Sequence, residues 1–173
     1  RGEHLMVVCY DNEAYMNTGI QRSSRTPEGA WTNTTPTGPN GFGKKRQQKP
    51  FSLLLAEHNA AYVATCSPAY MDDFRKKVEK ARDMSREGFT FLHVLAPCPT
   101  GWKSKPEIII QQCRDAGEKK IFPLVGIQLR PVSDHRGCEA AAACHGIYQN
   151  AKAFFPYERR AAGTASGNSG REL

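Results

Sequence analysis

A dense group of amide, hydroxyl and carboxylate side chains follows the first apolar run of the chain. The run at residues 5–10 leads directly into DNEAYMNTG, residues 11–19. Side-chain and backbone oxygens of this kind are good Mg²⁺ ligands, and Mg²⁺ usually binds a few protein groups together with substrate phosphates. Hydroxyls and backbone amides around Thr18 and Gly19 could face the phosphates themselves. The stretch therefore indicates a diphosphate site, and the alternative is an Asn-rich turn that only closes a strand.

Cys98 is the second residue that could carry chemistry. It lies in APCPTGW, residues 96–102, between two prolines that make the turn rigid. A free cysteine usually behaves as a small buried hydrophobe, so the residues alone favour a structural role. A ligand at a strand-end turn is the alternative.

The six cysteines of the chain form no CxxC pair and lie far apart in the sequence. This pattern does not match a secreted disulfide framework, so a reducing, cytoplasmic setting is expected. Cys9 and Cys66, in or beside strand-like runs, are expected in the core. Further potential ligands lie near the C-terminus: His135, Cys138, Cys144 and His145. Their spacing fits no familiar zinc pattern, so no metal site is predicted there.

Alternating strands and helices are predicted to position these residues. Strands are expected at residues 5–10, 61–65, 89–95 and 121–129, and helices at residues 51–58, 67–84 and 106–116. This alternation predicts an α/β fold with a parallel sheet, in which the nearly all apolar first strand is covered on both faces. Ligands of open α/β sheets gather at the carboxyl ends of the strands, and the segment of residues 11–19 begins at such an end.

The length and composition of the chain limit its possible architecture. With 173 residues, of which 39% are hydrophobic, the chain fits one domain with one core. The sequence contains no run of about 18 apolar residues, so a membrane span is not expected. A signal-peptide pattern is absent as well. Because the sequence opens at Arg1 rather than Met, and in mid-pattern, a further segment is expected upstream.

The net charge of +7 comes largely from short basic clusters, at residues 44–46, 75–77, 119–120 and 159–160. Solvated faces are the favoured interpretation of such clusters. An acidic partner attracted at long range is the next one. Aromatic residues do not interleave with the basic ones as they do in single-strand-binding proteins, so a nucleic-acid partner is not expected.

Two segments lack a regular pattern. Residues 32–50, rich in Gly, Pro, Thr and Lys, are expected to form a long functional loop. Beyond residue 130 the pattern decays, and the Gly/Ser/Thr-rich stretch from residue 161 predicts disorder. The predicted organisation is a domain at residues 1–130 followed by a divergent tail at residues 131–173.

Several long sequence blocks resemble a known family. They are YDNEAYMNTGIQRSS with TPEGAWTNTTPTG (residues 10–24 and 26–38), AYVATCSPAYMDDFRKKVEKA (61–81), HVLAPCPTGW (93–102) and IFPL (121–124). In order and spacing they resemble the β subunit of pyruvate:ferredoxin oxidoreductase, the thiamine diphosphate-binding subunit of the 2-oxoacid:ferredoxin oxidoreductases. The resemblance extends over residues 1–130 and implies the C-terminal part of a thiamine diphosphate-binding domain.

The resemblance also implies roles for the polar residues of the opening stretch. In that family, a Gly-Asp-Gly segment and a later Asn-containing loop hold the diphosphate through Mg²⁺. By resemblance, Asn12 is the side-chain Mg²⁺ ligand and Ala14 donates its backbone oxygen. Asn17, as the catalytic residue, and Thr18 would lie close to the thiazolium and the substrate, with Gly19 beside the cofactor. The few residues before the first strand leave no room for the Gly-Asp-Gly segment, which is therefore expected upstream.

For Cys98 the resemblance reverses the interpretation that the residues alone favour. It implies that Cys98 is the last ligand of a [4Fe–4S] cluster, whose other three cysteines are expected upstream. Thiolates are the ligands that such clusters require.

The implied reaction is the oxidative decarboxylation of a 2-oxoacid, with pyruvate as the expected substrate, to acyl-CoA, CO₂ and two electrons. The implied partners are coenzyme A, ferredoxin and the other subunits of the complex. No residue of the chain is an obvious general base, and the family's assisting glutamate is expected in another subunit or upstream. Two alternatives stay open: a related oxidoreductase for branched-chain 2-oxoacids or oxalate, and a non-enzymatic basic binding module.

Overall fold

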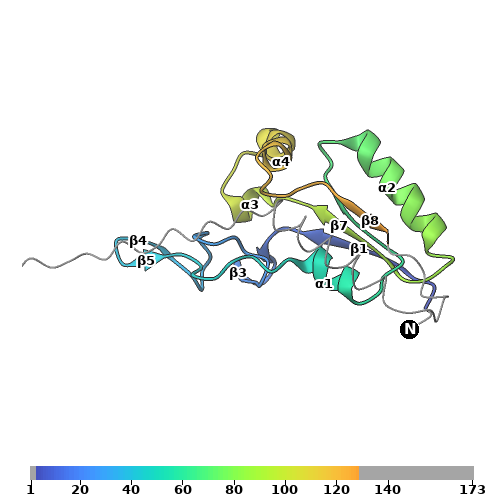
Figure 1. Cartoon of the computed structure of the whole chain (residues 1–173). Coiled ribbons are helices and arrows are strands. Elements are labelled where there is room, and N and C mark those ends of the chain that lie inside the picture. Colours follow the sequence, from blue (N-terminus) through green and yellow to red (C-terminus); the bar gives the residue numbers. More distant parts are fainter. Residues whose placement is uncertain (1–2, 129–173) are drawn as a thin grey trace, which may run out of the picture.

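A computed structural model of the chain describes residues 3–128. It contains one four-stranded sheet, two small hairpins and several helices (Figure 1). The sheet consists of β1 (Met6–Asp11), β6 (Tyr62–Cys66), β7 (Thr90–Leu95) and β8 (Gly126–Gln128). The hairpins pair β2 (Ala14–Tyr15) with β3 (Gln21–Arg22), and β4 (Thr37–Gly38) with β5 (Gly41–Phe42). The helices are α1 (Phe51–Glu57), α2 (Met71–Met84), α3 (Pro99–Trp102), the 3₁₀ turn η1 (Pro106–Ile108) and α4 (Ile109–Glu118). The tail predicted at residues 131–173 lies outside the described residues.

The sheet has the strand order β1-β7-β6-β8, and its first three strands are parallel, as predicted. The register sets Cys9 of β1 opposite His93 of β7, and Asp11 opposite Leu95. The carboxyl ends of β1 and β7 therefore lie side by side. The β2–β3 hairpin and α3 follow these two ends directly (Figure 1).

The prediction for the last strand was wrong in length and direction. Residues 121–129 were expected to form a parallel strand, whereas β8 covers three residues and runs antiparallel to β6. Pro123 has no N–H to donate to a strand ladder, which explains why regular pairing starts after it. The Thr65 hydroxyl holds this stretch instead: it donates to the Pro123 carbonyl (2.6 Å) and accepts from the Val125 N–H (2.7 Å). The chain thus enters the sheet from its carboxyl end, and β8 must run against the other strands.

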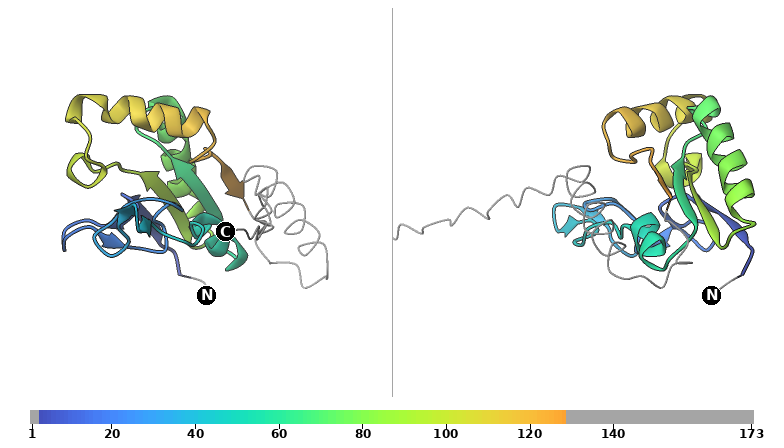
Figure 2. Two further views of the ribbon diagram at one scale, coloured as in Figure 1. Left: turned by 90° about the vertical axis from the view of Figure 1, so that its left-hand side faces the viewer. Right: turned by 45° about the vertical axis from the view of Figure 1, so that its right-hand side comes forward.

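Two apolar layers on opposite faces of β6 and β7 form most of the core. One layer combines both strands with α2: Tyr62, Ala64, Cys66, Ala81, Met84, Leu92 and Val94. The other combines Val63 and Phe91 with Ala56 and Ala60, in and just after α1. Because successive side chains alternate across a strand, α1 and α2 cover opposite faces of the sheet (Figure 2). Burying each large apolar side chain contributes about 1.5–3 kcal/mol, so these layers fix the sheet.

β1 is less covered than its sequence predicts. Val8 is 38% exposed and Tyr10 is 74% exposed, whereas β6 and β7 are buried along their whole length. Within residues 3–128, α2 packs on β6 and β7, and β1 is the edge strand. Of the two cysteines expected in the core, Cys66 is buried and Cys9 is half-buried.

The helix predicted from residue 67 begins later, at Met71. Ser67 forms a turn instead, because its carbonyl accepts the Tyr70 N–H (3.1 Å) and its hydroxyl accepts the Ala69 N–H (3.3 Å). Across the described part of the chain, every helix is too short or too polar to span a lipid bilayer.

Candidate functional site

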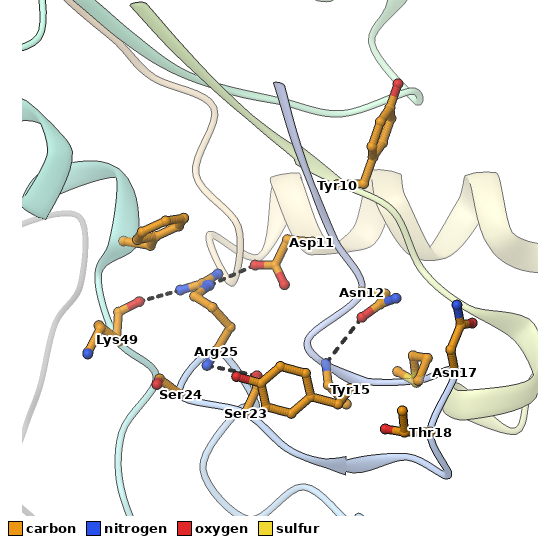
Figure 3. Close-up of a pocket in the computed structure, with 13 residues that line it drawn as sticks. Tyr10, Asp11, Asn12, Tyr15, Asn17, Thr18, Ser23, Ser24, Arg25 and Lys49 are labelled. Carbon is orange, nitrogen blue, oxygen red and sulfur yellow. Dashed lines mark hydrogen bonds and ion pairs between the residues drawn. The ribbon is translucent and has the colours of Figure 1, made fainter. Parts of the chain in front are cut away.

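A pocket of about 580 Å³, lined mostly by residues with polar side chains, opens at the carboxyl end of β1. Its lining comes from the end of β1, the β2–β3 hairpin, the segment after it and the start of α1 (Figure 3). The lining residues are Tyr10, Asp11, Asn12, Ala14, Tyr15, Met16, Asn17, Thr18, Ser23, Ser24, Arg25, Lys49 and Phe51. Ligand sites in proteins typically measure about 300–1,000 Å³, so the pocket can hold a cofactor-sized molecule.

Asn12 occupies a tight turn between β1 and β2. Its side-chain oxygen accepts the Ala14 N–H (3.3 Å), which is the local pattern that Asn favours in turns. The Trp102 indole N–H donates to the backbone oxygen of Asn12 (3.2 Å), so the turn is also held from α3. Asn12 and Ala14 therefore present an amide side chain and a short stretch of backbone to the same pocket.

Asn17 and Thr18 reach this pocket from the turn of the β2–β3 hairpin, and both are exposed. In Figure 3 they lie on the same side of the pocket as Asn12, opposite Arg25 and Lys49. Gly19 is not among the lining residues. Its N–H donates to the Met16 carbonyl (3.3 Å), and its φ of +116° is one that glycine adopts without strain. The structure thus gathers Asn12, Ala14, Asn17 and Thr18, and leaves Gly19 in the supporting turn.

The Asp11 carboxylate is the centre of a buried hydrogen-bond network at the pocket wall. One oxygen accepts the backbone N–H of Glu13 (2.8 Å). The other accepts from Arg25 Nε (2.7 Å) and from His93 Nε2 (2.7 Å). The Asp11 carboxylate can only accept here, so His93 carries a proton on Nε2, and its Nδ1 shares a hydrogen bond with the Ser52 hydroxyl (2.9 Å). Burial alone would raise the pKa of Asp11, but the His93 hydrogen bond and the Arg25 charge outweigh it, and the pKa lies below its usual value.

Glu13 is a second buried carboxyl group, on the far side of the Asn12 turn. Its side chain accepts from Gln48 Nε2 (2.9 Å) and is 8% exposed. Burial raises the pKa of Glu13 to about 7, against the opposing effect of the Gln48 hydrogen bond. Lys44 is buried nearby, with its ammonium group bonded to three backbone carbonyls, those of Ser24, Thr26 and Gln47.

Lys44 and Gln48 belong to the segment of residues 32–50 that was predicted as a long functional loop. The structure shows that this segment contains the β4–β5 hairpin and makes polar contacts with Glu13 and with residues 24–26, on either side of the β2–β3 hairpin. It supports the pocket and contributes Lys49 to the lining.

Cys98 is not among the lining residues of this pocket and directly precedes α3. It is half-buried, and its backbone carbonyl accepts the Trp102 N–H (2.8 Å). Within residues 3–128, no three His, Cys, Asp or Glu side chains gather closely enough to hold a metal ion. Trp102 links the Cys98 turn to Asn12, because its backbone N–H donates to the Cys98 carbonyl and its indole N–H donates to the Asn12 carbonyl.

Four residues of the pocket framework were given no role from the sequence: Asp11, Arg25, Ser52 and His93. Asp11 lies in the stretch of residues 11–19 that predicted a diphosphate site. One signal was present, since His93 interrupts an apolar strand at residues 89–95 that is buried throughout. A buried imidazole requires hydrogen-bond partners, which must come from neighbouring elements. Their identity depends on register and packing that the sequence does not display.

The residues of the pocket fit a cation-bound diphosphate in part. An amide oxygen and a backbone oxygen are the type of ligand that Mg²⁺ accepts, and Arg25, Lys49 and two serine hydroxyls offer positive charge and donors to phosphate oxygens. Asp11 is the one carboxylate among the lining residues, and it is 7% exposed and already paired with Arg25 and His93.

Comparison with protein families gives a match over residues 1–94 to the thiamine pyrophosphate enzyme family, C-terminal TPP binding domain. The chain is 49% identical over 128 residues to pyruvate synthase subunit PorB of Methanothermobacter marburgensis, which covers 74% of this chain and 44% of that protein. It is 47% identical over 124 residues to ketoisovalerate oxidoreductase subunit VorB of Pyrococcus furiosus, covering 72% and 39%. Identity to the β subunit of an NADH-dependent phenylglyoxylate dehydrogenase from Aromatoleum evansii is 48% over 124 residues, covering 72% and 28%.

Among solved structures, a 2-oxoglutarate:ferredoxin oxidoreductase from Magnetococcus marinus, with 2-oxoglutarate, coenzyme A and succinyl-CoA bound, shares the fold. The TM-score is 0.52 at 21% identity, over 81% of this chain and 41% of that one. The predicted α/β class and the resemblance to 2-oxoacid oxidoreductase β subunits are thereby confirmed. The chain spans less than half the length of each of these relatives. It belongs to the thiamine pyrophosphate enzyme family and carries the C-terminal TPP-binding domain of that family.

Proposed function

We propose that this chain provides part of the thiamine diphosphate site of a 2-oxoacid oxidoreductase, with pyruvate as the substrate and ferredoxin as the electron acceptor. One observation carries the proposal: Asn12, Ala14, Asn17 and Thr18 converge on one pocket at the carboxyl end of β1. Pyruvate is favoured because several of the similar proteins are pyruvate synthase subunits. A branched-chain 2-oxoacid is the second candidate, because a ketoisovalerate oxidoreductase subunit matches almost as well.

In the proposed site, the Asn12 side chain and the Ala14 backbone oxygen hold Mg²⁺, which neutralises the diphosphate. Asn17 and Thr18 are exposed at the rim, where they can donate and accept hydrogen bonds to the substrate. Arg25 and Lys49 place positive charge at the other side of the pocket, toward anionic groups. When bound, thiamine diphosphate supplies the electron sink for decarboxylation, and the protein contributes orientation and charge.

Cys98 is proposed as a ligand of a [4Fe–4S] cluster that takes up the electrons. It lies on a rigid turn, and Trp102 forms hydrogen bonds both to this turn and to the Asn12 turn. A cluster at Cys98 would therefore be separated from the cofactor site by the Trp102 contacts alone. The remaining cluster ligands, coenzyme A binding and the ferredoxin contact are assigned to other parts of the complex.

The test is thiamine diphosphate binding by the Asn12→Ala variant of the full-length protein. Loss of a metal ligand leaves the diphosphate less neutralised, and affinity is expected to fall on the order of 10–100-fold, by analogy with disturbed metal shells. Calorimetric titration at fixed Mg²⁺ measures this. Gln111→Ala serves as the control, because Gln111 is an exposed amide on α4 that bonds only to its own helix. Equal affinity in the Asn12 variant and the control contradicts the assignment.

A further inference from the structure

We propose that Asp11 is a positioning residue that sets the Asn12–Ala14 turn for cation binding, and that His93 acts through it. The inference rests on the proposed function, since it concerns how the proposed Mg²⁺ ligands are held. It goes beyond that function because neither residue is proposed to touch the metal. Both side chains are occupied within the protein, at the junction of β1, β7 and α1.

The peptide unit between Asn12 and Glu13 is held at both of its ends. Its N–H, which belongs to Glu13, donates to an oxygen of Asp11 at 2.8 Å. Its carbonyl, which belongs to Asn12, accepts the Trp102 indole N–H at 3.2 Å. A peptide plane fixed in this way sets the direction of the Asn12 side chain and the course of the backbone to Ala14.

The turn requires such support because of its backbone conformation. Glu13 has a φ of +68°, which is in the left-handed region that a residue with a Cβ adopts only at a cost. Strained residues persist where the surroundings over-determine them, and they cluster at ligand sites. Asp11 supplies that constraint through the N–H of the strained residue itself.

The Asp11 carboxylate is in turn fixed from three elements. His93 of β7 donates to it at 2.7 Å, and Ser52 of α1 holds the other side of the imidazole at 2.9 Å. Arg25 donates to it at 2.7 Å and is anchored on the Lys49 carbonyl at 2.6 Å. Asp11 is 7% exposed and His93 is 2% exposed, so water does not compete for these bonds. Ligands held in place before binding lose less freedom when the metal arrives, and this raises affinity.

The experiment measures Mn²⁺ binding, in place of Mg²⁺, to the full-length protein with thiamine diphosphate present. Electron paramagnetic resonance reports the free Mn²⁺ concentration, so the readout is independent of turnover. Asp11→Asn can still accept the Glu13 N–H, but its amide nitrogen cannot accept from Arg25 or His93. The dissociation constant for Mn²⁺ is expected to rise by about 10–100-fold, as for partners that orient metal ligands.

A pair of substitutions at His93 separates positioning from packing. His93→Gln keeps a side-chain N–H that can reach Asp11, and Mn²⁺ affinity should stay near that of the unchanged protein. His93→Leu has similar bulk and no donor, and affinity should fall as it does for Asp11→Asn. The pair also answers the question if the Asp11 variant does not fold.

Asp73→Asn is the matched control for loss of an ion pair. It removes the ion pair between Asp73 and the largely buried Lys77 (2.6 Å) on α2, away from the turn. This variant should unfold at a lower temperature and bind Mn²⁺ as before. The proposal is overturned if Asp11→Asn binds Mn²⁺ normally, if His93→Gln and His93→Leu are equally weak, or if Asp73→Asn is as weak as Asp11→Asn. If the unchanged protein shows no thiamine diphosphate-dependent Mn²⁺ binding, the proposed function fails as well.

Discussion

At the scale of single residues, Glu13 makes the stability of the fold depend on pH. Its carboxyl group is buried, and its pKa is raised from 4.5 to about 7, first by burial and then by the charge of Asp11, against the Gln48 hydrogen bond. Between these two pH values, the folded state holds a proton that the unfolded state has released. The free energy of unfolding therefore falls as pH rises from about 4.5 to about 7.

Glu13→Gln removes this ionisation and keeps an oxygen that can accept from Gln48. At pH 8 the variant should be more stable than the unchanged protein by up to about 3 kcal/mol, and at pH 4 nearly equal to it. Urea unfolding of the metal-free full-length protein at both pH values measures the difference. Glu118→Gln, at the exposed end of α4, controls for the loss of one negative charge. The same pH dependence in Glu13→Gln and the unchanged protein would contradict the buried-carboxyl explanation.

Cys98 makes a second residue-scale prediction, and Cys113 provides its control. Cys113 is fully buried among apolar side chains that include Leu95 and Phe122, so its thiol is not accessible to an iron–sulfur cluster. In the full-length protein, Cys98→Ser should reduce bound iron and remove one [4Fe–4S] signal, whereas Cys113→Ser should retain both. Iron analysis and low-temperature electron paramagnetic resonance compare the two variants. Equal iron content in both variants would contradict the cluster assignment and support the structural role that the sequence around Cys98 favours.

At the scale of elements, the sequence predicted what depends on local pattern. α1 and β7 lie within one residue of their predicted bounds, because apolar periodicity and the neighbouring prolines mark them. The direction of β8 was not predictable in this way. It follows from the point at which the chain re-enters the sheet and from the Thr65 hydroxyl, which lies 58 residues from its partner Pro123.

The same limit applies to the candidate site. Asn12, Ala14, Asn17 and Thr18 are neighbours in sequence, and one turn and one hairpin bring them to the same pocket. Their common role was predicted from the family resemblance. Asp11 and His93 are 82 residues apart, and their contact requires the parallel register of β1 and β7. The contact between Asp11 and His93 could therefore not be predicted from the sequence, whereas the turn could.

At the scale of the whole molecule, β1 leaves one side of the sheet open within the described residues. It pairs with β7 alone, and its outer face carries Val8 and Tyr10 next to the exposed Leu5. Unpaired backbone groups beside exposed apolar side chains form a surface on which another strand can add. The net charge of +7 opposes association only weakly at physiological salt, because charges more than about 8 Å apart are screened.

The 173-residue chain is therefore expected to self-associate through β1 when it is prepared alone. Val8→Lys places a charge on the exposed face of the edge strand, where it makes strand addition costly, and should shift the chain toward the monomer. Ile110→Lys adds the same charge at an exposed site on α4 and should leave association unchanged. Sedimentation velocity over a series of concentrations, from about 1 µM to about 100 µM, distinguishes the three proteins, since apolar edges associate in the micromolar range. A monomeric unchanged chain at the highest concentration, or equal effects of the two lysines, would show that the edge of β1 does not drive association.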